Sequence, residues 1–135
     1  MSIEFFSWIA VFAGAAASFA VGALWYSPLL FGGLWQEAID KSPEELGNPV
    51  RAMGHAAVIS ILTAIAMALL QQATATDGVV AGGILGFTVG LGFVFMHEAK
   101  SAGFTGKPIR LVLIDGGSEI ASLTVMGAII AGLSG

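Results

Sequence analysis

Four long apolar segments set the strongest constraint on what this chain can fold into. Residues 5–27, 50–72, 78–97 and 109–133 are almost continuously apolar. Each has about 20 residues or more, the length that a helix needs to cross a hydrocarbon core of about 30 Å. Inside lipid the backbone must satisfy its own hydrogen bonds, which favours helices. The sequence therefore predicts an all-α, polytopic membrane protein with four transmembrane helices in a bundle.

The composition supports a lipid environment rather than a water-facing surface. Hydrophobic residues make up 56% of the chain and charged residues only 10%. A soluble domain has roughly 25% charged residues, so this chain has too few to cover a surface in water. We therefore expect one transmembrane domain over residues 1–135, with the lipid bilayer as its main partner. The absence of cysteine excludes disulfides and thiolate metal ligands, and we expect no cofactor.

The basic residues predict how the chain is oriented. Four spans place both termini on one side of the membrane and the connections 28–49 and 98–108 on the other. All five basic residues lie in or beside those two connections: Lys41, Arg51, Lys100, Lys107 and Arg110. Loops on the cytoplasmic side carry the excess of Lys and Arg. The pattern predicts a protein of the bacterial inner membrane with both termini in the periplasm.

Aromatic residues gather where the first span ends, in the stretch GALWYSPLLFGGLW. Along a helix Trp8 and Trp25 lie about 25 Å apart, which matches the separation of the two aromatic belts of a membrane. After Pro28, residues 29–40 place apolar side chains at helical spacing, which predicts a short interfacial helix. The alternative is that the first helix continues beyond the membrane. The predicted interfacial anchors are Trp8, Trp25, Tyr26 and Trp35.

Small residues recur every four positions on two of the predicted helices. One set is Gly14, Ser18 and Gly22, and the other is Gly78, Gly82, Gly86 and Gly90. Such faces allow the backbones of neighbouring helices to approach closely. Packing within the bundle explains one of the two faces. We expect the second face to support a homo-oligomer or contact with another membrane protein.

Two acidic residues lie inside the fourth span. Asp115 and Glu119 are four positions apart, so they share one face of the helix, about 9 Å and 15 Å from its start at residue 109. A charged acid near the middle of a bilayer costs at least about 2.5 kcal/mol, and two neighbouring carboxylates also repel. We therefore expect Glu119 to be protonated or paired. The candidate partners are His97 and His55 for Glu119, and Arg51 and Arg110 for Asp115.

Two interpretations of these polar residues remain open. In the first, Glu119, Asp115, His97 and His55 line a half-channel that opens to the cytoplasm and binds a proton, a metal ion or a cationic substrate. In the second, the acids form hydrogen bonds between helices that contribute about 0.6 kcal/mol per contact. A dedicated metal site would need more ligands at known spacing, so we expect none.

Three motifs give the chain a family resemblance. They are GALWYSPLLFG followed by Leu34-Trp35, then GKPIRLVLI, and finally VMGAIIAG in the last span. With these motifs, nearly the whole chain resembles the domain-of-unknown-function 1761 family of small bacterial membrane proteins. The resemblance implies four helices in a membrane and no catalytic residues. This sequence has acids at Asp115 and Glu119, where the family pattern often has an amide and a histidine.

The functional hypothesis is a small transporter- or channel-like oligomer in which Asp115 and Glu119 are the protonatable or cation-binding groups. The alternative is an accessory subunit that packs against a larger membrane complex through its glycine-rich faces. We expect no enzyme, because no nucleophile lies beside a suitable base. We expect no nucleic-acid partner, because no basic face with interleaved aromatic residues is present.

Overall fold

The computed structural model describes residues 7–39 and 47–134, and every regular element within them is a helix. In chain order the elements are α1 (Trp8–Trp25), α2 (Gly32–Ile39), α3 (Pro49–Ala73), α4 (Val79–Val89), the π-helix η2 (Gly90–Phe95), α5 (Met96–Thr105) and α6 (Ile109–Ser134). Four helical segments are long and apolar enough to cross a membrane, which confirms the predicted class. Lys41 and the predicted start of the first helix at residue 5 lie outside the described residues.

The third span is longer than the sequence predicts. It runs without interruption from Val79 to Thr105, through α4, η2 and α5, whereas the prediction ended it at residue 97. The charged residues after 97 mark where the helix leaves the apolar region, but they are compatible with helical backbone. The helix ends where Gly106 adopts a left-handed conformation with φ of +75°. Glycine tolerates that conformation, and Pro108 follows two positions later.

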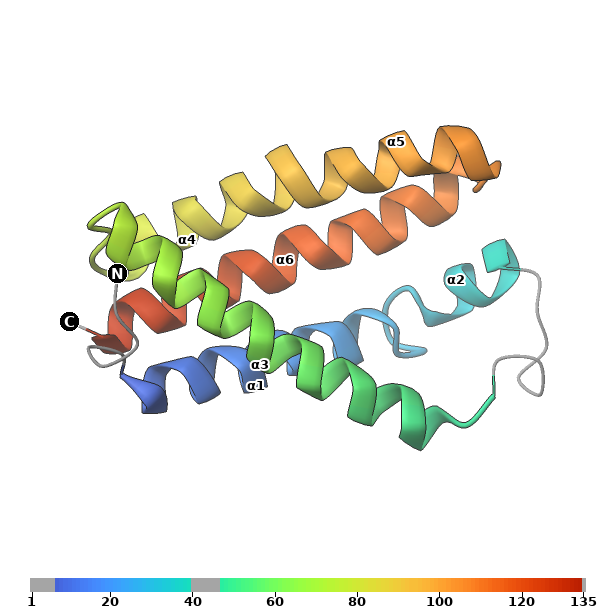
Figure 1. The fold of residues 1–135 in the computed structure, drawn as a ribbon. Coiled ribbons are helices and arrows are strands. Elements are labelled where there is room, and N and C mark those ends of the chain that lie inside the picture. Colours follow the sequence, from blue (N-terminus) through green and yellow to red (C-terminus); the bar gives the residue numbers. More distant parts are fainter. Residues whose placement is uncertain (1–6, 40–46, 135) are drawn as a thin grey trace.

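The start of α1 and the end of α6, which we call the terminal end, lie at one end of the described molecule, and α2 and the α5–α6 turn lie at the other (Figure 1). Helix α6 is central. It contacts α1 on one side and α4 and η2 on the other, while α3 crosses over α1 and α6. Because α6 touches each of the other spans, its side chains determine how the spans fit together.

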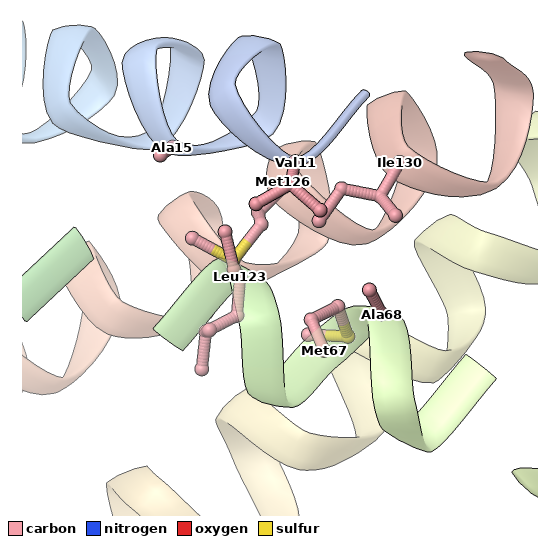
Figure 2. Packing of buried hydrophobic residues seen from close by; sticks show 8 residues of the cluster. Val11, Ala15, Met67, Ala68, Leu123, Met126 and Ile130 are labelled. Carbon is pink, nitrogen blue, oxygen red and sulfur yellow. The ribbon is translucent and has the colours of Figure 1, made fainter. Parts of the chain in front are cut away.

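The apolar core lies in the half of the molecule that is nearer to the termini. Met126 and Ile130 of α6 and Val11 of α1 are the largest fully buried side chains. Figure 2 shows them meeting Leu123 and, from α3, Met67. On α3 the buried residues are Ala64, Met67, Ala68 and Gln71, all in its C-terminal part. Helix α3 therefore covers α6 near the termini and leaves it at the other end.

Both small-residue faces pack against α6. A Cβ atom at Gly82 or Gly86 would overlap the backbone of α6, and one at Gly90 would lie 2.8 Å from Ile120 Cα. On α1, a Cβ at Gly14 would lie 2.6 Å from Ile130 Cγ1. Ser18 is buried, and its carbonyl accepts a hydrogen bond of 3.4 Å from Ser122 Oγ.

Both faces therefore contact α6 within the chain, and the expected contact of one face with a second copy or another membrane protein stays a prediction. Because Gly127 has no side chain, α4 approaches the backbone of α6 closely there. Helix α1 packs against another side of α6, where Gly14 meets Ile130. Gly22 and Gly78 differ from the rest, because no atom lies within 4 Å of the place where a Cβ would stand at either one. Gly78 instead precedes α4 with a φ of +86°, a conformation that glycine adopts readily.

Candidate functional site

A cluster of charged and polar side chains lies at the end of the molecule away from the termini. Lys107, in the short turn between α5 and α6, forms ion pairs with Glu98 of α5 and with Asp115 of α6, the latter at 2.8 Å. Tyr26 Oη, at the end of α1, donates a hydrogen bond of 2.6 Å to the other oxygen of Asp115. We call these four residues the Lys107 cluster. It joins three of the four spans.

The aromatic stretch after the first span positions Tyr26. Trp25 Nε1 donates a hydrogen bond of 2.9 Å to the carbonyl of Ile114, and its ring lies over Gly117, where a Cβ would be 2.9 Å from Trp25 Cζ2. The ring of Trp35 meets Tyr26 edge-on, with centroids 5.8 Å apart. Trp25 and Tyr26 thus attach α1 to α6. Their predicted role as interfacial anchors, with that of Trp8 and Trp35, stays a prediction.

Partial burial changes the acid–base properties of the two cluster residues outside the spans. For Lys107, burial alone lowers the pKa, but the hydrogen bonds and negative charges of Asp115 and Glu98 outweigh it and raise the pKa above its usual value. For Tyr26, burial raises the pKa first, and the hydrogen bond to Asp115 raises it further. Lys107 is therefore charged and Tyr26 is a neutral hydrogen-bond donor at physiological pH.

Glu119 lies on a part of α6 that the other helices do not cover, which we call the opening. Between Ile114 and Ala131, a stretch that the structure describes completely, it is the one residue of α6 that is exposed. Leu123 and Met126 share its side of the helix one and two turns further on, and α3 covers them. At the level of Glu119, α3 has moved away and none of its residues from 49 to 63 is buried. The opening therefore comes from the divergence of α3.

The charges that act on Glu119 are the carboxylates of Glu98 and Asp115. Glu119 forms no hydrogen bond or ion pair with any other residue that the structure describes. Lys107 is the cluster's single ammonium and is already shared between Glu98 and Asp115. The site therefore combines three carboxylates with one ammonium, which leaves an excess of acidic groups in a largely apolar setting.

The structure separates the other candidate residues from this site. His55 and His97 are both exposed, and neither forms a hydrogen bond or ion pair with a described residue. Arg110 pairs with Glu37 of α2 at 3.3 Å, and Arg51 is exposed on α3. The expected arginine partner of Asp115 is therefore replaced by Lys107, whose turn is short enough to bring the ammonium back over α6.

The π-helix explains why Glu98 enters the site and His97 does not. Each residue of an α-helix turns the chain by about 100°, so a straight helix that keeps Gly86 and Gly90 against α6 would also turn His97 toward it. The wide turn of η2 delays the rotation by one residue and presents Glu98 instead. His97 is a sequence candidate only because it lies near the end of the predicted third span, and the sequence contains no signal for the π turn.

A comparison with protein-family models matches residues 9–131 to the family described as "Protein of unknown function (DUF1761)". The chain belongs to this DUF1761 family. Searches of curated proteins and of solved structures each return no match. Membership agrees with the resemblance carried by the WYSPLLFG motif, and it adds no activity. Among residues 7–39 and 47–134 of this DUF1761 protein, no group of three or more His, Asp or Glu side chains is arranged to hold a metal ion.

Sequence reasoning identified Asp115 and Glu119 but missed the roles of Lys107, Glu98 and Tyr26. The signal for Tyr26 was present, because a tyrosine at the end of one span is well placed to reach an acid one or two turns inside another. Lys107 had no clear signal, because the sequence predicts a connection over residues 98–108 and the turn is short only since α5 continues to Thr105. Glu98 had no signal, because its direction depends on the π turn.

Proposed function

We propose that this DUF1761 protein is a small transporter- or channel-like membrane protein in which Glu119 takes up a proton or another cation. The observation that supports this most is the exposure of Glu119 on a stretch of α6, Ile114 to Ala131, whose other residues are buried or half-buried. Glu119 lies there beside the carboxylates of Glu98 and Asp115. A carboxylate in apolar surroundings near other negative charges gains stability when a cation or proton joins it. Ion movement, rather than catalysis, is the function this arrangement favours.

The proposed orientation places the opening on the cytoplasmic side. Arg51, Lys100, Lys107 and Arg110 lie in the elements at the end opposite the termini (Figure 1). The excess of basic residues on cytoplasmic loops supports a position in the bacterial inner membrane with both termini in the periplasm. Helix α2 lies at the same end and pairs with Arg110 through Glu37, which supports its proposed place in the membrane interface.

The second candidate function is an accessory subunit of a larger membrane complex, whose partner covers the opening. The exposed Glu119 supports this candidate too, because a partner that supplies a hydrogen bond or a positive charge would remove its contact with lipid. The small-residue faces no longer support it, since α6 occupies them. The two candidates differ in one respect: a transporter keeps Glu119 accessible to water, whereas an accessory subunit buries it.

Flux through purified protein in liposomes tests the proposal. We expect Glu119→Gln to remove pH-linked cation or proton flux while the protein stays folded and retains the wild-type assembly size. Glu37→Gln is the matched control, because Glu37 is an exposed acid that pairs only with Arg110 among the described residues. Loss of assembly in Glu119→Gln with no flux in the wild type would support the accessory subunit instead.

A further inference from the structure

The π-helix η2 places one more residue in the third span than a continuous α-helix would hold. Before it, Gly82, Gly86 and Gly90 approach α6 at intervals of four. After it, Phe95 covers Gly116 of α6, Glu98 meets Lys107, and Ala102 is buried. The interval from Gly90 to Phe95 is the width of a π turn. Such turns occur frequently at functional sites.

A regular α-helix through the same sequence would present different side chains to α6. At about 100° per residue, the line through Gly86 and Gly90 continues to Phe93 and His97. In the structure these two are exposed, Phe93 to 69% of its surface. His97 and Glu98 are therefore alternatives for one position beside the Lys107 cluster, and the turn geometry of η2 decides between them.

We propose that η2 is a register switch: when its wide turn relaxes to α-helical geometry, α5 rotates by about 100° and His97 replaces Glu98 beside Lys107 and Asp115. The local structure permits the rotation, because Gly92 has open space around it and the α6 surface under Phe95 is Gly116. The exchange removes one carboxylate from the cluster and adds an imidazole. This inference goes beyond the proposed function and does not depend on what Glu119 binds.

Pairs of engineered cysteines report the two registers, because the natural chain has none. Val112 lies one turn before Gly116, so it is the α6 position opposite the start of α5. We expect disulfide formation between cysteines at positions 98 and 112 in the observed register, and at positions 97 and 112 in the relaxed one. In lipid bilayers both pairs should react. If both thiols of the 97/112 pair stay free while the 98/112 pair forms its disulfide to completion, the switch is overturned.

Deletion of Gly92 sharpens the test. It removes the surplus residue, so the segment forms a regular α-helix that still turns Glu98 toward α6. In this variant the 97/112 pair should form its disulfide at least tenfold more slowly than in the full-length chain. The 98/112 pair should react unchanged. The matched control deletes Ile84, an exposed residue of α4 where the helix has no surplus residue. That deletion should turn Gly82 away from α6 and destabilise the protein.

Equal 97/112 reactivity with and without Gly92 contradicts the proposal. Should the Gly92 deletion fail to fold, the two cysteine pairs in the full-length chain decide the question by themselves. The readout is independent of transport, so a protein that carries no ion can still show the switch. Conversely, transport by a protein with a fixed register would overturn only this inference.

Discussion

The two ends of α6 are packed by different means. Toward the termini, glycines of α4 and α1 bring backbones together around α6, and Met126 and Ile130 are buried there among apolar neighbours. Toward the other end, α3 moves away and the helices are joined by the ion pairs and hydrogen bond of the Lys107 cluster. Close apolar packing admits no substrate, whereas a polar cluster beside an opening can exchange protons and ions. Apolar packing therefore holds the helices together at one end, and we propose that the function lies at the other.

The largest loss of stability is expected for a substitution at the packed end of α6. Gly86→Leu places a side chain where the backbone of Leu123 lies, so α4 cannot keep its position on α6. Overpacking of this kind costs about 3 kcal/mol or more when backbone must move. Thermal unfolding in detergent should show a large loss of stability. Gly22→Leu is the control, since nothing lies within 4 Å of that Cβ position; equal losses in both variants would contradict the account.

Removing the ammonium of the polar end should have a smaller effect. Lys107→Met leaves Glu98 and Asp115 without their shared counter-charge, and the Lys107 side chain is only 26% exposed. We expect a loss of about 1–3 kcal/mol, between the values for exposed and buried pairs. Arg110→Met, which breaks an exposed pair with Glu37, should cost about 0.5 kcal/mol or less. If the arginine variant is the less stable of the two, the cluster does not join the spans.

The pH dependence of the Lys107 contribution has a definite sign. Because the folded protein raises the lysine pKa above 10.5, the ion pair stabilises the protein fully below that value and loses its effect as the pH rises through the folded pKa. The stability difference between the wild type and Lys107→Met should therefore be constant from about pH 7 to about pH 9 and shrink only above 10.5. A difference that disappears near neutral pH would contradict a charged lysine in the cluster.

Within the Lys107 cluster, the smaller effect is expected for the hydrogen bond from α1. Tyr26→Phe removes the donor to Asp115 and keeps the ring against Trp35. We expect a loss of about 1–1.5 kcal/mol in unfolding free energy. Combining it with Lys107→Met should give less than the sum of the two losses, because both residues bind the same carboxylate. Strict additivity would show that Tyr26 and Lys107 act separately.

The number of candidate spans could be predicted from the sequence, because the length and hydropathy of a continuous segment do not depend on the rest of the fold. Asp115 and Glu119 could also be identified as candidate site residues, since placing an acid in an apolar span is costly. The partners were not, because contacts between spans depend on the three-dimensional arrangement. Lys107 reaches Asp115 through a tight turn, and the small faces of α1 and α4 meet a common helix. Glu98 was missed, and His97 named as the candidate, because the sequence contains no signal for a π turn.

Side-specific labelling of single cysteines tests the contrast between the two ends most directly. In a chain without native cysteine, Glu119→Cys and Met126→Cys differ by two helical turns on one side of α6. We predict that a membrane-impermeant thiol reagent modifies the cysteine at position 119 from the cytoplasmic side only, and leaves the one at position 126 unmodified. Failure to modify position 119 from either side, or modification from the periplasmic side, would contradict an opening that leads from Glu119 to the cytoplasm.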